Sequence, residues 1–223
     1  MLWYKAWLET RWRFIFMLAT IAVMWVPDLL GLPSQRLAIA LRLAAVLQFS
    51  VTALFLAGAG INTQTFYAAT TGYHGSMLFT LSLPVSRRRL FLVRAGLGAL
   101  ETWVFIAVLV SVMVLRAPQA LSSAEALRYA ARAMICIMAV YSLSALLACF
   151  LDEMWQFMSS ALVLGALAAL MSRSSLVAQF SPLRGLTVYP AHATMPWAPV
   201  MASIVITVVL VCSSLLVLRR KEF

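Results

Sequence analysis

The sequence has 223 residues, of which 64% are hydrophobic and 11% are charged, with a formal net charge of +10 and a mean hydropathy of +0.96. A soluble domain of this length carries about twice that charged fraction, so the composition excludes a soluble protein and predicts one integral membrane domain. The basic residues flank apolar runs, as they do at the inner face of membrane proteins, and this excludes nucleic-acid binding as the main reason for the charge.

Residues 1–13 predict an amphipathic helix ahead of the membrane spans. Lys5, Glu9 and Arg13 recur every four positions and make one polar stripe, while Trp3 and Trp7 lie elsewhere on the helical wheel. Such a helix is expected to lie in the plane of the lipid headgroups. A plain aromatic belt before the first span is the alternative.

The remaining sequence, residues 14–223, predicts an all-α polytopic fold. A span needs about 20 mostly apolar residues, and six runs reach that length. Only Asp152 and Glu153 separate the fourth and fifth runs, which predicts a tight helical hairpin. The six predicted spans are residues 14–32, 42–60, 90–115, 133–151, 154–172 and 197–218.

An even number of spans places both termini on the same side of the membrane. That side also receives the loop 61–89 and the hairpin at Asp152. The positive-inside rule then predicts that this side is the cytoplasm. The basic clusters on this side are Lys5, Arg11 and Arg13, then Arg87, Arg88, Arg89 and Arg94, then Arg219, Arg220 and Lys221.

The segment 173–196 precedes the last span and contains Pro182, Gly185, Pro190 and Pro196. It is too short and too interrupted for another span, yet it is apolar for an outer loop. We expect short helices that dip back into the outer surface and are shielded by protein.

The residues needed for ATP hydrolysis or metal binding do not form a recognisable motif. The two lysines, Lys5 and Lys221, do not follow a glycine, so no phosphate-binding loop is possible and this chain is not expected to hydrolyse ATP. His74 and His192 lie far apart and outside the spans, which argues against a haem or histidine–metal site. We therefore predict no catalytic residue, metal or cofactor on this chain. The cysteines lie in apolar runs without metal-like spacing: Cys136, Cys149 and Cys212.

The stretch "GSMLFTLSLPVSRRRLFLVRAGLGALE", residues 75–101, carries the most specific pattern. Gly72 and Gly75 break regular structure, Ser76 is a suitable N-cap, and Pro84 ends the short helix that they predict. Such a helix in a cytoplasmic loop offers a surface that a soluble partner can grip. The alternative is that it lies on the membrane while its arginines extend to the headgroups.

This stretch resembles the cytoplasmic loop and third span of the ABC-2 type permeases, the membrane subunits of one class of ATP-binding-cassette exporters. That loop typically runs as an acidic residue, Gly-Thr/Ser-Leu/Met, a Leu-rich turn and Pro-x-Ser-Arg. Here His74 precedes the glycine and Leu78 follows the methionine, where the family often has acidic residues. The matching residues are Gly75, Ser76, Met77, Leu81, Pro84, Val85, Ser86 and Arg87. The opening "WYKAWLETRWRF" is similar to the family's in-plane elbow helix, and the ending "LRRKEF" resembles its basic tail.

The resemblance implies a permease subunit of an exporter in the bacterial cytoplasmic (inner) membrane. It would pair with a second permease copy, and two separate ATPase subunits would hold ATP and Mg. The alternative is a non-transport membrane assembly factor, or a membrane enzyme without a recognisable motif. The resemblance implies that the ATPase contacts a coupling helix formed by Gly75, Ser76, Met77, Leu78, Phe79, Leu81, Pro84, Ser86 and Arg87.

Four charged residues fall inside predicted spans: Asp28, Arg42, Arg94 and Glu101. Glu101 is expected roughly 7–8 Å inside the third span, at ~1.5 Å of rise per residue. It either lines the transport path or forms an ion pair with Arg94 or with an arginine of another helix, or it makes an interhelical hydrogen bond without a transport role. Arg42 either pairs with Asp28 near the outer surface or extends to the headgroups.

The fifth span carries a stripe of small residues, Ala161, Gly165 and Ala169, at intervals of four. Small residues let helices approach closely in lipid. In the family that this chain resembles, the first and fifth spans are thought to meet between subunits, so the stripe is a candidate subunit interface. Packing within the chain is the alternative.

Overall fold

The computed structural model describes residues 2–23, 46–57, 87–116, 123–187 and 196–220, and these residues are almost entirely helical, with no strand among them. The labelled helices are α1 (Leu2–Val23), α6 (Arg87–Arg116), α7 (Ser123–Ala148), α8 (Glu153–Arg173), α9 (Ser175–Phe180), α10 (Pro182–Leu186) and α11 (Trp197–Arg220). A further apolar helix, Val46–Leu56, lies between α1 and α6 in the sequence and is called the 46–56 helix below.

Four helices among the described residues are long and apolar enough to cross a membrane: Arg88–Leu115, Ala124–Ala148, Met154–Arg173 and Trp197–Arg219. The predicted all-α membrane protein is therefore confirmed for the part of the chain that the structure describes. The count of six spans stays a prediction, because the expected spans 14–32 and 42–60 extend outside the described residues.

The helix α7 begins at Ser123, well before the start at residue 133 that the charge pattern predicted. The charged residues Arg128 and Arg132 were expected to lie before the span, but the helix continues through them. Alanines, which have the highest helix propensity, supply much of this first part of α7. Arg132 is buried, and its nitrogen atoms bind backbone carbonyls of a later segment, as described below.

The helix α1 runs without interruption from Leu2 to Val23, so no helix end marks the expected boundary at residue 13 between an in-plane helix and the first span. Its buried side chains recur at helical spacing and face the other helices. The exposed aromatic residues of its first half lie elsewhere on the helix. An orientation of this half in the membrane plane stays a prediction. The buried side chains are Ala6, Thr10, Phe14, Met17 and Ile21.

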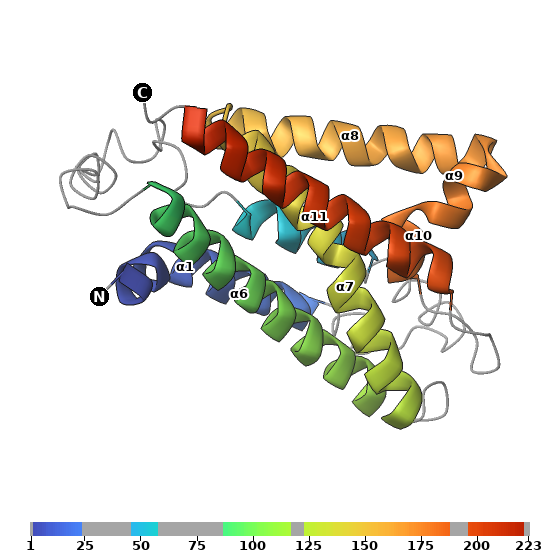
Figure 1. Ribbon diagram of the computed structural model, residues 1–223. Helices are drawn as coiled ribbons and strands as arrows, with labels where there is room; N and C mark the ends of the chain where they lie inside the picture. The colour runs from blue at the N-terminus through green and yellow to red at the C-terminus, as the bar shows by residue number, and fades with distance from the viewer. Residues whose placement is uncertain (1, 24–45, 58–86, 117–122, 188–195, 221–223) are drawn as a thin grey trace.

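The helix α7 is the centre of the bundle. It packs against α6, α8, α10 and α11, and α1 lies along α6 (Figure 1). Small residues on the buried face of α7 let its neighbours approach closely, as they do between helices in lipid. The largest fully buried apolar side chains include Phe49, Phe105, Ile106, Leu109 and Ile137.

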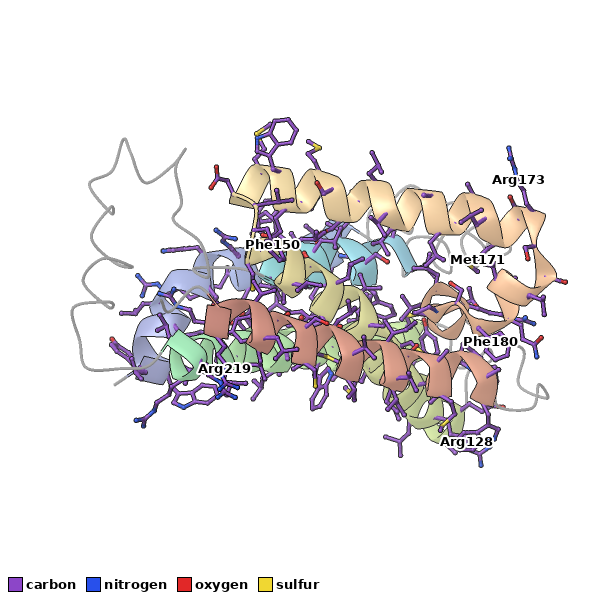
Figure 2. The ribbon with its side chains drawn as sticks, turned by 45° about the horizontal axis from the view of Figure 1, so that its top comes forward. Arg128, Phe150, Met171, Arg173, Phe180 and Arg219 are labelled. Atoms are coloured by element: carbon purple, nitrogen blue, oxygen red, sulfur yellow. The ribbon has the colours of Figure 1, made fainter. Side chains whose placement is uncertain are left out.

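The starts of α1, α6 and α8 lie at the same end of the bundle as the ends of α7 and α11 (Figure 1). Figure 2 shows Arg219 near this end and Arg128 and Arg173 at the opposite end. The turn from α7 to α8 is tight, since only residues 149–152 separate the two helices. The backbone N–H of Gln156 donates to the Asp152 carbonyl at 2.8 Å in the first turn of α8.

The helices α9 and α10 are the short helices expected after the fifth span. The Ser174 hydroxyl caps α9 by accepting from the Val177 amide at 3.5 Å, and the Ser181 hydroxyl caps α10 by accepting from the Leu183 amide at 3.3 Å. Pro182 occupies the first turn of α10, where its missing N–H costs nothing. Pro182, Gly185 and Leu186 of α10 are buried, whereas α9 has no buried residue.

Candidate functional site

Polar side chains, most of them buried, gather around the C-terminal end of the 46–56 helix. Each such group costs free energy unless it finds a hydrogen-bond partner, so its partners show what holds the helices together. The group has two parts, called the Glu101 cluster and the Gln156 cluster. The Glu101 cluster comprises Thr10, Arg13, Glu101 and Tyr141, and the Gln156 cluster comprises Ser144, Gln156 and Ser160 with the carbonyls of Leu54 and Ala57.

Glu101 of α6 is buried, with only 1% of its surface exposed. The Thr10 hydroxyl of α1 donates a hydrogen bond to Glu101 Oε1, whereas Oε2 has no hydrogen-bond partner in the described part of the chain. The carboxyl group is therefore only half satisfied. The contact supplies the interhelical hydrogen bond that we expected as one alternative for this residue.

The third predicted span carries a second charged residue, Arg94, which is buried on α6 two turns before Glu101. Arg13 of α1 interacts electrostatically with Glu101, and its Nη1 donates to the Phe55 carbonyl at 3.4 Å. The Arg13 guanidinium also lies 5.5 Å from the centre of the Phe55 ring. Both of the ionisable residues predicted inside the third span thus lie in the bundle interior, as such residues do in membranes.

Gly98 lets three helices meet beside this cluster. A Cβ atom at Gly98 would lie 2.5 Å from Tyr141 Oη of α7 and 3.1 Å from the Leu56 carbonyl oxygen of the 46–56 helix. The Tyr141 hydroxyl donates to the Ala95 carbonyl of α6 at 2.9 Å. The close approach of α6, α7 and the 46–56 helix therefore depends on the absence of a side chain at residue 98.

Gln156 of α8 is the centre of the second cluster and is 2% exposed. Its Nε2 donates to the Ala57 carbonyl at 2.8 Å and to Ser144 Oγ of α7 at 2.7 Å, with a longer contact of 3.5 Å to the Leu54 carbonyl. The Ser160 hydroxyl donates to Ser144 Oγ at 3.2 Å. One amide thus joins α7, α8 and the end of the 46–56 helix.

A third polar contact lies toward the opposite end of α7 and holds α10. Arg132 Nε donates to the Gly185 carbonyl at 2.9 Å, and Arg132 Nη2 donates to the Thr187 carbonyl at 2.8 Å. The Tyr129 hydroxyl donates to the Leu186 carbonyl at 2.9 Å. Three successive carbonyls at the C-terminal end of α10, which have no donor within that helix, are thereby satisfied.

Several predicted site residues lie outside the described residues. The coupling residues from Gly75 to Ser86 and the intramembrane Arg42 are among them, and Arg87 is described only as the first residue of α6. Among the described residues, no group of three or more His, Cys, Asp or Glu side chains could hold a metal ion.

The small-residue stripe of α8, formed by Ala161, Gly165 and Ala169, is exposed. A Cβ atom at Gly165 would meet no other atom within 4 Å. The helix itself contacts α7 and α9, and little of its spanning part is buried. The stripe therefore does not pack against another described helix. Packing within the chain, one of the two alternatives left open by the sequence, is not seen among the described residues.

The sequence did not identify Thr10, Arg132, Tyr141 or Gln156 as site residues. Gln156 carried the clearest signal, because it is an amide near the start of a span that contains no charge. Thr10 carried none, since a threonine hydroxyl in a helix can also bind the carbonyl one turn before it. Tyr141 carried none either, because nothing in its local sequence indicates which group its hydroxyl meets.

Comparison with models of protein families, with curated proteins and with solved structures finds no match to this chain.

Proposed function

We propose that this chain is the permease subunit of an ATP-binding-cassette exporter of the ABC-2 type, driven by a separate ATPase subunit. The observation that carries the proposal is the resemblance of residues 75–101 to the coupling loop and third span of that family. The helix α6 begins at Arg87, the last matching residue of the loop, and continues to Arg116. A partner bound to the loop would therefore act directly on a membrane-crossing helix.

The geometry of α6 supports this role. Thirty residues of helix span about 45 Å, so a tilt imposed at Arg87 reaches the far end of the helix as a displacement. On its buried face α6 contacts α1 through Glu101 and α7 through Tyr141. A ligand shifts an equilibrium only by its difference in affinity for the two states. ATP would therefore have to bind the partner more tightly in one arrangement of these helices than in the other.

A second permease copy would complete the translocation path. The exposed, apolar α8 supports this part of the proposal, since its small-residue stripe leaves room for the close approach of another helix. Substitution Gly165→Leu is expected to weaken cross-linking between copies in native membranes while leaving the unfolding of the single chain unchanged. An unchanged cross-linking yield would contradict α8 as the subunit interface.

The partner can be identified by purification of the tagged chain in mild detergent, followed by mass spectrometry and an ATPase assay. We expect an ATP-binding-cassette ATPase with the wild-type chain and none with a chain that lacks residues 76–84. A double substitution at the opposite end of the bundle, Arg128→Ala with Arg173→Ala, serves as the control and should retain the ATPase.

Equal membrane insertion of the three proteins is checked by extraction and gel filtration. Retention of the ATPase by the deletion variant would contradict the coupling assignment. If no ATPase accompanies the wild-type chain, the proposed function is wrong.

A further inference from the structure

The 46–56 helix ends inside the bundle, and its last carbonyls bind groups from other helices. The final carbonyls of any helix lack a donor within that helix, and in a membrane they must find one in the surrounding protein. Here the Phe55 carbonyl accepts from Arg13 of α1, and the Ala57 carbonyl accepts from Gln156 of α8. These two donors come from helices that lie before and after the 46–56 helix in the chain.

The same helical turn also lies close to α6, because the Leu56 carbonyl oxygen is 3.1 Å from the position of a Cβ at Gly98. The turn is therefore held between α1, α6 and α8. Its link to α7 runs through Gln156, which bonds at once to the Ala57 carbonyl and to Ser144 of α7. Gln156 thus joins this turn to both α7 and α8, next to the tight connection between them.

The chemistry of Gln156 makes this link stiff. Its two short hydrogen bonds, of 2.8 and 2.7 Å, require two N–H donors on one nitrogen atom, which a neutral amide supplies. The site is 2% exposed, so water does not replace a bond that breaks. If the turn moved away from Gln156, the Ala57 carbonyl would be buried without a donor. This cost favours movement of the turn and Gln156 together.

We propose that Gln156 is a positioning residue that transmits movement from the end of the 46–56 helix to the α7–α8 connection. The inference rests on the proposed function, because the residues that follow this helix form the loop expected to bind the ATPase. Movement of the loop then reaches the bundle by two routes: forward through α6 and backward through the end of the 46–56 helix to Gln156.

The experiment uses the full chain with its copurified ATPase in lipid nanodiscs. An environment-sensitive fluorophore is attached at Phe150→Cys, which is exposed in the α7–α8 connection (Figure 2), in a Cys212→Ser background. Two variants remove donors of Gln156 at similar volume: Gln156→Met has no donor, and Gln156→Glu, which is neutral when buried, has a single O–H donor and cannot make both bonds. We expect each to reduce the ATP-induced fluorescence change about fivefold, the effect of losing one net hydrogen bond of about 1 kcal/mol.

The matched control is Gln48→Met. Gln48 lies on the same 46–56 helix, near its start, and its Nε2 donates to Thr20 Oγ1 of α1 at 2.6 Å. It is thus an interhelical amide on the same helix, far from the end that meets Gln156. We expect this variant to keep the ATP-induced change of the wild-type complex. Melting temperatures of all variants are measured in parallel.

Two outcomes would overturn the inference alone. One is a wild-type fluorescence response in both Gln156 variants, and the other is an equal loss of the response in the Gln48 control. Failure of the proposed function is distinguished by the wild-type complex, since it would show no copurified ATPase and no response to ATP. Loss in both Gln156 variants, with the control intact and ATPase binding unchanged, supports the inference.

Discussion

Thr10 of α1 and Glu101 of α6 lie 91 positions apart in the sequence and share a buried hydrogen bond, in which the threonine hydroxyl donates to one oxygen of the carboxyl group. The other carboxyl oxygen has no hydrogen-bond partner among the described residues. The pair joins the two helices at a place where an apolar contact would avoid the desolvation of a carboxyl group. Substitution of only one of the two residues is therefore expected to lower the free energy of unfolding, because the other polar group stays buried without its partner.

Substitution Thr10→Val keeps the volume of the side chain and removes the donor to Glu101. We expect the free energy of unfolding to fall by about 1–3 kcal/mol, because a buried acceptor is left unsatisfied. Circular dichroism during SDS-induced unfolding in mixed micelles measures this. Thr10→Ser keeps the hydroxyl and serves as the control. In the double variant with Glu101→Met, the loss should be smaller than the sum of the two single losses.

Two glycines in membrane-crossing helices should respond oppositely to alanine. Gly98→Ala places a Cβ 2.5 Å from Tyr141 Oη, so the tyrosine must move and lose its bond to the Ala95 carbonyl. We expect a loss of stability of about 1–3 kcal/mol. Gly165→Ala meets no atom within 4 Å and should be neutral or stabilise the helix by up to about 1 kcal/mol.

The unfolding assay in mixed micelles compares these two glycine variants. A second substitution, Tyr141→Phe, removes the hydroxyl oxygen that a Cβ at Gly98 would strike. It should restore part of the stability lost in Gly98→Ala. Equal stability of the two alanine variants would contradict the close approach of α6 and α7.

Arg132 should keep α10 closed over Cys136. The thiol is buried, and a Cβ at Gly185 of α10 would clash with Cys136 Sγ. In a Cys149→Ser, Cys212→Ser background, the rate of maleimide labelling of Cys136 reports the opening of α10. Arg132→Met removes the bonds to the Gly185 carbonyl of α10 and to the Thr187 carbonyl that follows α10, and we expect labelling to be roughly tenfold faster.

Arg128→Met is the control for this labelling. Arg128 lies one turn earlier on α7 and is exposed (Figure 2). The substitution should leave the labelling rate of Cys136 unchanged. An unchanged rate in Arg132→Met would show that the bonds to Arg132 do not hold α10 in place.

The two ends of the bundle should lie on opposite sides of the membrane. Single cysteines at the exposed positions Arg88 and Arg219 test one end, and single cysteines at Arg128 and Arg173 test the other. With Cys212 replaced by serine, a membrane-impermeant maleimide applied to intact cells should label only the second pair. Labelling of Arg88→Cys from outside would contradict the cytoplasmic position of the coupling loop, and the proposed function with it.

The extents of α6, α8 and α11 follow closely from the sequence, because the insertion of a helix into lipid depends on the summed hydropathy of about 20 neighbouring residues. The turn at Asp152 was predicted for the same reason, since two adjacent acids interrupt an apolar run. The burial of Arg94 and Glu101 also followed from a local rule, namely that charges inside a span face the interior of the bundle.

The partners of the buried polar groups were decided only by tertiary structure. Thr10, Tyr141 and Gln156 bind groups supplied by other helices, and no local pattern encodes which helix brings a donor or an acceptor within 3 Å. The start of α7 shows the same limit. The sequence indicated that the span begins after Arg132, but carbonyls of α10, more than fifty positions later, satisfy this arginine and allow its burial within the helix.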